Sequence, residues 1–322
     1  MKALLCITLL TFCGTAANNA LEAWSKRVSE GKALTRAGNY AAATQAFRRA
    51  LAVAEGANAG DQKLVEIYDA LASAYAGAGQ YAESEHQYRH ALALAEKTEG
   101  PQSLDYAVLV ASIAALPTQI GNREPIIEML REAIAVNRRT GSARELAIVR
   151  VCLAQILMDR RRYVEAESVL LDAQSSAASL MTTDPGLLAD LLNGLGFLRF
   201  NQGRYRESIE LYLESLRLLE SVTGDEHPLL VAPLNNLALS YLKLGRLNEA
   251  EVTLRRANTM CGKTLGEDHP TCGALLEGYA VVLRKLNRKR EAKAVAARAA
   301  QITRAFRSRN GVGSTISVTA LR

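Results

Sequence analysis

Two loops of this sequence hold residue types that bind metal ions. Each loop carries two carboxylates, a histidine and a proline, and the second follows the first by 42 residues. Imidazole and carboxylate groups from adjacent loops are common ligands of zinc and other divalent ions. A metal-dependent enzyme is therefore one hypothesis for the chain. The loops are Asp225, Glu226, His227 and Pro228, then Glu267, Asp268, His269 and Pro270.

A structural role explains the same loops with fewer assumptions. Proline is favoured at the first position of a helix, and polar residues before it can satisfy free amide groups there. His86 and His90 have the spacing of a metal-binding pair on a helix, but the sequence offers no third ligand near them. We therefore expect no cofactor and no metal, and a solvated face for the histidine pair.

Other catalytic signatures are missing from the sequence. There is no glycine-rich phosphate loop, no paired-cysteine zinc spacing and no Gly-x-Ser-x-Gly nucleophile turn. We therefore expect a non-catalytic protein with no catalytic residues.

The elements that would position the loops repeat along the chain. A small residue recurs every 40 to 42 residues, mostly after an apolar one, and a turn residue follows it by seven. Glycine and asparagine tolerate the left-handed conformation that ends a helix, so Arg161 is an exception at the turn. The small residues, called anchors below, are Gly31, Ala72, Ala114, Ala154, Gly196, Ala238 and Ala280. The turn residues are Gly38, Gly79, Gly121, Arg161, Gly203, Gly245 and Asn287.

Each turn leads into a second helix with its own pattern. A large apolar residue opens most of these helices, and small residues follow where two helix backbones must approach closely. A period of this length indicates stacked copies of one helical hairpin, because a single hairpin cannot bury its apolar stripe alone. The large residues are Tyr40, Tyr81, Tyr163, Tyr205 and Leu247. The small ones are Ala43, Ser84, Ala166, Ser208, Ala250 and Ala292, then Ala50, Ala91, Ala133, Ala173, Ser215, Ala257 and Ala299.

The pattern resembles the tetratricopeptide repeat, whose signature runs leucine–glycine, tyrosine, alanine and phenylalanine. Leu71 and Ala72, with Tyr75, Tyr81 and Tyr88, fit it. The period exceeds that family's roughly 34 residues, and the connectors hold the surplus. This longer variety resembles the repeats of kinesin light chains and their bacterial relatives over roughly residues 24–307. Its marks are Gly224, His227, Pro228, Leu234, Asn235, Asn236, Leu237, Ala238, Leu265, Gly266, His269 and Pro270.

The resemblance implies an all-α fold, a right-handed superhelical solenoid of about seven hairpins spanning residues 18–307. It places the units near residues 24, 64, 105, 146, 187, 229 and 271, with the first helices lining a concave groove that binds peptides. By that analogy the chain is a monomeric scaffold for a protein or peptide partner. The predicted groove residues are Gln155, Met158, Asn193, Phe197, Phe200, Asn235, Leu239 and Lys243.

The first residues indicate a secretory signal. Lys2 gives a positive start, residues 3–12 are apolar and residues 14–17 are small. The apolar run is shorter than the roughly 20 residues that span a bilayer. We therefore expect a signal peptide over residues 1–17, cleaved near Ala16 or Ala17, and a periplasmic or secreted protein. Residues 308–322 are predicted to form a flexible tail.

Three cysteines remain after such cleavage. Cys152 lies in a predicted first helix, where packing in the core is the expected role. Cys261 and Cys272 bracket one connector, and an oxidising compartment would permit a disulfide between them. The geometry decides that question, so the sequence leaves it open.

The last unit is strongly basic. Residues 284–322 carry a net charge of +10, whereas the whole chain carries +6, which leaves −4 for residues 1–283. A polar outer face is expected of a terminal repeat, and a contact with a polyanion or an anionic membrane is the alternative function. Phe306 is the one aromatic residue in the basic stretch, which disfavours nucleic acid. The proposed basic patch is Arg284, Lys285, Arg288, Lys289 and Arg290.

The third unit departs from the pattern. Pro117 falls within its predicted first helix, where proline ends or kinks a helix. Pro125 falls near the start of its second helix, where proline is tolerated. We expect a degenerate repeat, with a bend in the superhelix as the alternative.

Overall fold

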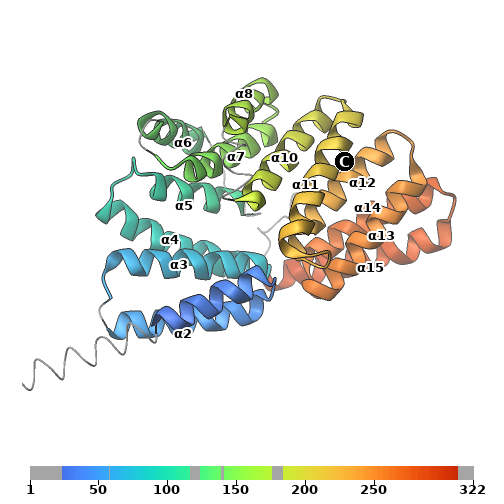
Figure 1. Cartoon of the computed structure of the whole chain (residues 1–322). Helices are drawn as coiled ribbons and strands as arrows, with labels where there is room; N and C mark the ends of the chain where they lie inside the picture. Colours follow the sequence, from blue (N-terminus) through green and yellow to red (C-terminus); the bar gives the residue numbers. More distant parts are fainter. Residues whose placement is uncertain (1–23, 58, 117–123, 139–140, 176–183, 311–322) are drawn as a thin grey trace, which may run out of the picture. The chain divides into compact units, whose positions relative to one another are not determined.

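The computed structural model describes residues 24–57, 59–116, 124–138, 141–175 and 184–310. Within these ranges the chain folds into helices and turns, with no β-strand (Figure 1). It divides into two compact units, Met1–Pro101 and Gln102–Arg322. The all-α prediction is confirmed for the described residues, whereas a single solenoid running through both units stays a prediction.

The first unit contains two hairpins. Residues 24–36 are helical, and α2 (Tyr40–Gly56), α3 (Asp61–Gly77) and α4 (Tyr81–Thr98) follow. Helix α3 packs against both α2 and α4. The core is apolar side chains of both hairpins, and Phe47, Ile67 and Leu71 are almost fully buried in it.

The second unit continues the hairpins and holds the predicted binding residues. Each first helix packs on its own second helix, and α11 and α13 then pack on the next first helix (Figure 1). The helices are α5 (Leu104–Ala115), α6 (Glu124–Asn137), α7 (Ala143–Asp159), α8 (Tyr163–Gln174), α10 (Pro185–Asn201), α11 (Tyr205–Thr223), the 3₁₀ turn η1 (Pro228–Leu230), α12 (Val231–Lys243), α13 (Leu247–Thr264), α14 (Pro270–Lys285) and α15 (Lys289–Asn310). The first element of each unit, namely α5, α7, α10, η1 and α14, begins within a few residues of the unit start that the sequence predicts.

The anchor residues are small because the two helices of a hairpin touch there. A Cβ atom on Gly196 would lie 2.7 Å from the ring of Tyr212, and one on Gly31 would lie 2.5 Å from the ring of Phe47. On the second helix, the small residue Ser84 lies against the anchor Ala72, and its Oγ donates to the carbonyl of Ala72 at 2.8 Å. The small residues therefore lie where the two helices of a hairpin pack against each other, as the sequence predicts.

The turns adopt the left-handed conformation that their residues predict. The described turn glycines have positive φ, from 72° at Gly38 to 78° at Gly203. Arg161 and Asn287 are the described non-glycine residues with positive φ, at 59° and 62°. The repeat geometry therefore imposes this conformation on Arg161, although an arginine Cβ disfavours it.

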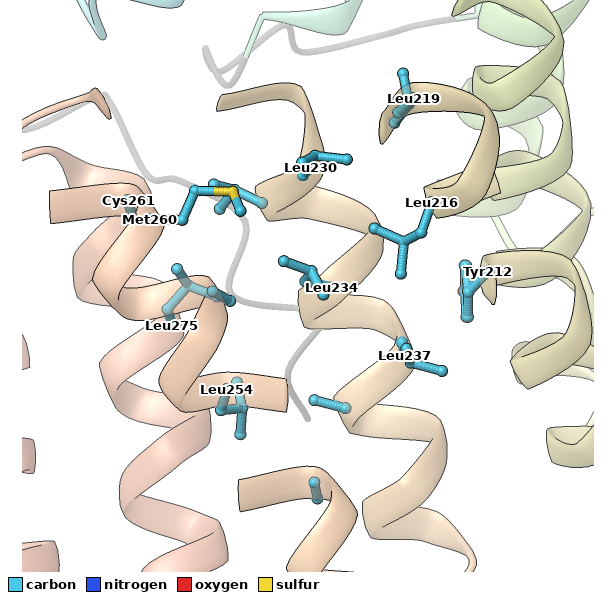
Figure 2. Close-up of a cluster of buried hydrophobic side chains, with 14 of the residues drawn as sticks. Tyr212, Leu216, Leu219, Leu230, Leu234, Leu237, Leu254, Met260, Cys261 and Leu275 are labelled. Atoms are coloured by element: carbon cyan, nitrogen blue, oxygen red, sulfur yellow. The ribbon is translucent and has the colours of Figure 1, made fainter. Parts of the chain in front are cut away.

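One continuous cluster of buried side chains runs from α10 to α14 (Figure 2). Leu216 and Leu219 of α11 face Leu230 and Leu234 of the following η1–α12 segment. Burying each such side chain contributes about 1.5–3 kcal/mol. Stacking of neighbouring hairpins thus supplies the stability that one hairpin lacks.

The ends and the third unit show smaller departures from the sequence prediction. Helix α5 ends at Ala115, before Pro117, which itself lies outside the described residues, as do residues 1–17. Pro125 is the second residue of α6, as expected. Residues 308–310, assigned above to the tail, are helical because α15 continues to Asn310.

Cys261 and Cys272 form a disulfide, which answers the question that the sequence left open. Cys261 lies near the end of α13 and Cys272 in the first turn of α14, with Cα atoms 5.6 Å apart. Both cysteines are buried. The bond therefore joins the last two hairpins.

Candidate binding surface

One stripe of each first helix in the second unit stays accessible to solvent. The residues of α7, α10, α12 and α14 that are not fully buried recur at spacings of three and four, while the other faces pack on second helices. Neighbouring first helices contact each other, so the stripes adjoin. We call this surface the first-helix face. It comprises Gln155 and Asp159 of α7, Asp190, Asn193, Phe197 and Asn201 of α10, Asn235, Asn236 and Lys243 of α12, and Glu277, Val281 and Lys285 of α14.

Side-chain amides join the stripes of α10 and α12. Asn236 Nδ2 donates to Asn193 Oδ1 at 3.2 Å, and Asn201 Nδ2 donates to the carbonyl of Phe197 at 2.8 Å. Asn235 Oδ1 is buried and has no hydrogen-bond partner within the part of the chain that the structure describes. An unsatisfied buried acceptor costs about 1–3 kcal/mol.

The two phenylalanines of the face differ in their surroundings. Both are half-buried, but the Phe200 ring packs edge-on against Tyr205 of the same hairpin, with centroids 5.4 Å apart. Among the described residues no ring contact is recorded for Phe197. Phe197 is therefore the phenylalanine better placed to contact a ligand.

Two of the predicted groove residues are wrong in their exposure. Met158 and Leu239 are 3% and 7% exposed, so they belong to the core. The next residue, Asp159, is exposed. The first-helix face therefore includes Asp159 and not Met158. The other six predicted residues are half-buried or exposed, as the prediction requires: Gln155, Asn193, Phe197, Phe200, Asn235 and Lys243.

A carboxyl and a thiol of this region have shifted pKa values. Desolvation, followed by the charge of Asp184, raises the pKa of Asp190 to about 6, although part of its side chain meets solvent. Burial, followed by the charge of Asp190, raises the pKa of the Cys152 thiol to about 12. The thiol is thus protonated at neutral pH, whereas a nucleophilic cysteine needs the thiolate.

The sequence matches the profile of one protein family. The profile describes a tetratricopeptide repeat and matches residues 20–97, 63–139 and 187–261, together more than half of the chain. The chain belongs to the tetratricopeptide repeat family. No curated protein matches its sequence.

Solved structures share the fold of this tetratricopeptide repeat protein at low sequence identity. BtubC (BKLC) from P. vanneervenii is 17% identical, with a TM-score of 0.54 over 73% of this chain and 92% of its own. A Rap protein complexed with Competence and Sporulation Factor is 13% identical, with a TM-score of 0.55 over 89% and 99%. NprR in complex with its cognate peptide NprX is 15% identical, with a TM-score of 0.61 over 84% and 75%.

In this tetratricopeptide repeat protein the two His–Pro loops act as helix caps. Nδ1 of His227 accepts from the amide of Leu229 at 3.2 Å, and Nδ1 of His269 accepts from the amide of Thr271 at 3.2 Å. Each histidine therefore satisfies an amide group at the start of a helix. The described residues contain no group of three His, Cys, Asp or Glu side chains placed to hold a metal.

The predicted basic patch loses one member to ion pairing. Arg288 lies 2.5 Å from both Glu291 and Glu251, so these carboxylates neutralise its charge. The sequence had assigned Arg288 to the basic patch. Arg284, Lys285, Lys289 and Arg290 are exposed, and no hydrogen bond or ion pair of their side chains is recorded within the described chain.

Sequence reasoning missed a ladder of ion pairs that follows the repeat. An arginine just before a second helix pairs with a glutamate three residues later, four times in succession. Glutamate in the first helical turn is favourable on its own, and the pairing fixes the arginine beside it. The Arg-x-x-Glu spacing recurs in the sequence and would have predicted these ion pairs. The pairs are Arg162–Glu165, Arg204–Glu207, Arg246–Glu249 and Arg288–Glu291.

Two further features lie outside the first-helix face. A surface pocket of about 460 Å³ lies between α11 and the turn after α12, and no predicted groove residue lines it. In addition, no described helix is at once long and apolar enough to cross a bilayer.

Proposed function

We propose that this protein is a non-catalytic scaffold that binds a peptide or protein segment on the first-helix face. The observation that carries the proposal is the row of amides on α10 and α12 beside Phe197. Amide side chains offer both a donor and an acceptor to a peptide backbone, and the half-buried Asn193, Asn235 and Asn236 lie in that row. Half-buried Phe197 offers apolar contact area, which commonly marks interaction sites.

The similar folds support this proposal. The Rap protein and NprR were both solved with a bound factor or peptide. Their identity to this chain is low, so the likeness supports the type of ligand and says nothing of its sequence. The peptide selection described next is designed to identify the ligand.

The proposal is tested by selecting peptides from a random display library on the full chain. We expect Phe197→Ala with Asn235→Ala to weaken the selected peptides at least tenfold while leaving the helical circular dichroism unchanged. A matched control replaces Val164 and Leu171 of α8, which are 84% and 49% exposed. Unchanged affinity in the Phe197–Asn235 variant, or equal loss in the control, would refute the assignment of the surface.

The same proposal places the protein outside the cytoplasm, periplasmic or secreted. The expected signal peptide supports export, and so does the Cys261–Cys272 disulfide, because disulfides persist in oxidising compartments. Cell fractionation with thiol blocking tests the location: the exported protein yields one free thiol per chain, at Cys152. A protein recovered from the cytoplasm with all five cysteines of the chain as free thiols would contradict it.

A competing function is a polyanion or anionic-membrane binder acting through the basic end. The exposed cations of α14 and α15 without recorded ion pairs favour it. Contacts with phosphate groups lose affinity steeply as salt rises, whereas an apolar and amide surface does not. If the selected peptides no longer bind at high salt, the result would favour a polyanion or anionic-membrane binder.

A further inference from the structure

Helix α15 is the last helix that the structure describes, and among the described helices none stacks on it as α12 stacks on α11. On α11 the stacking stripe includes Ile209, Leu216 and Leu219, which are buried in the cluster shared with η1 and α12; Figure 2 shows Leu216 and Leu219. The equivalent positions of α13, 42 residues later, are Glu251 and Asn258, which are half-buried, and Cys261, which is buried. In both cases the next first helix covers the stripe.

The same stripe on α15 has a different composition. Two repeats after Ile209, Leu216 and Leu219 stand Lys293, Ala300 and Thr303, which are exposed or half-buried. We call the surface formed by Lys293, Ala296, Ala300, Thr303, Arg304 and Arg307 the end face. No helix within the described chain follows α15 to cover it.

The charge of the end face is of one sign. Lys293, Arg304 and Arg307 are exposed, and neither a hydrogen bond nor an ion pair is recorded for their side chains among the described residues. Other cations of this hairpin are neutralised: Arg298 lies 2.9 Å from Asp268. Glu291, the carboxylate of α15, already pairs with Arg288.

A solubilising cap accounts for only part of this arrangement. A terminal repeat needs a polar outer face, and a mixture of both charges meets that need. Here the end face combines two alanines with three exposed cations and no carboxylate. Small residues let a second helix approach closely, while the cations attract carboxylates and repel a second copy of the same face.

We propose that the end face binds an acidic amphipathic helix of a partner protein, which takes the position of a next first helix. The contact would be made in the way that α12 packs on α11, with glutamate or aspartate side chains facing Lys293, Arg304 and Arg307. This surface is separate from the first-helix face, so the chain would hold two ligands at once.

The test uses synthetic amphipathic helices that share an alanine–leucine stripe and differ in the flanking residues. Fluorescence anisotropy with the full chain at about 0.1 M salt compares glutamate, glutamine and lysine versions. We expect the glutamate helix to bind about tenfold more tightly than the glutamine helix, since each exposed ion pair adds a modest factor. The variant Lys293→Glu, Arg304→Glu, Arg307→Glu should reverse the preference toward the lysine helix.

Two controls separate this contact from a general attraction to anions. Arg206→Glu with Arg255→Glu reverses exposed charges on α11 and α13 and should change nothing. Ala300→Trp should block the close approach of a helix and weaken the glutamate helix at least tenfold, while leaving binding of polyphosphate and anionic vesicles unchanged. Circular dichroism confirms that each variant is folded.

Three results would overturn the proposal. The first is equal binding of the glutamate and glutamine helices, and the second is a charge-reversed variant that binds the glutamate helix normally. The third is polyphosphate or vesicles binding more tightly than the helix with no effect of Ala300→Trp, which would assign the end face to a polyanion. Each outcome is independent of whether peptides bind the first-helix face.

Discussion

The close contact between Gly196 and Tyr212 makes a quantitative prediction about the hairpin. A Cβ atom on Gly196 would lie 2.7 and 2.9 Å from two ring atoms of Tyr212, a fully buried side chain that has little room to move. Gly194 lies on the same helix, but its Cβ would meet Leu170 at an ordinary 3.5 Å. The two glycines are therefore a matched pair.

The magnitude follows from comparing the two alanine variants. Both gain about 1 kcal/mol from the helix propensity of alanine over glycine, so this contribution cancels in the difference. Overpacking a core contact costs roughly 1–3 kcal/mol. We therefore expect Gly196→Ala to be about 1–3 kcal/mol less stable than Gly194→Ala, which itself should be slightly more stable than the native chain.

The repeats suggest which second change restores the packing. Ala154 and Ala238, the equivalents of Gly196, are followed sixteen residues later by Leu170 and Leu254 where Gly196 has Tyr212. Tyr212→Leu should therefore rescue Gly196→Ala, with a coupling free energy of at least about 1 kcal/mol. Urea unfolding followed by circular dichroism measures all four proteins of the cycle. Additive effects, or a Gly196→Ala variant as stable as Gly194→Ala, would refute the reasoning.

Two further predictions concern the turns and the disulfide. Arg161→Gly relieves a positive φ and should stabilise the chain by about 0.5–1 kcal/mol. Asn287→Gly should stabilise it less, because asparagine tolerates this conformation. Thermal unfolding compares the two variants, and a destabilised Arg161→Gly would contradict the argument. Cys261 and Cys272 are 11 residues apart, so reducing their disulfide should lower the free energy of unfolding by about 3 kcal/mol. The variant Cys261→Ser, Cys272→Ser should not respond to reductant. A native chain whose stability does not change with reductant would count against the bond.

Spacing in the sequence was enough to predict the hairpins. The anchors and turn glycines recur because every hairpin needs a close helix contact and a left-handed turn, so local residue types report them. Gly196 is such an anchor, where an added Cβ would lie 2.7 Å from Tyr212, and Gly203 is such a turn residue, with a φ of 78°. Cys261 and Cys272 were recognisable as a candidate pair, but only the fold brings them together.

The binding surface was predicted less accurately because it depends on the rotation of each helix. Periodicity places Met158 and Asp159 on the same side of α7, yet packing buries the first and exposes the second. Arg288 looked available as part of a basic run, but its partner Glu251 comes from the preceding hairpin, 37 residues earlier. Such tertiary contacts leave no mark in a local pattern.

Hydrogen exchange tests whether ligands bind the first-helix face. Amide exchange of the full chain is measured with and without a library-selected peptide. We expect α10 and α12 to gain the most protection, around Asn193, Phe197 and Asn235, and α8 and the outer side of α11 to stay unchanged. Protection confined to α15 or to the second helices would contradict binding at this face.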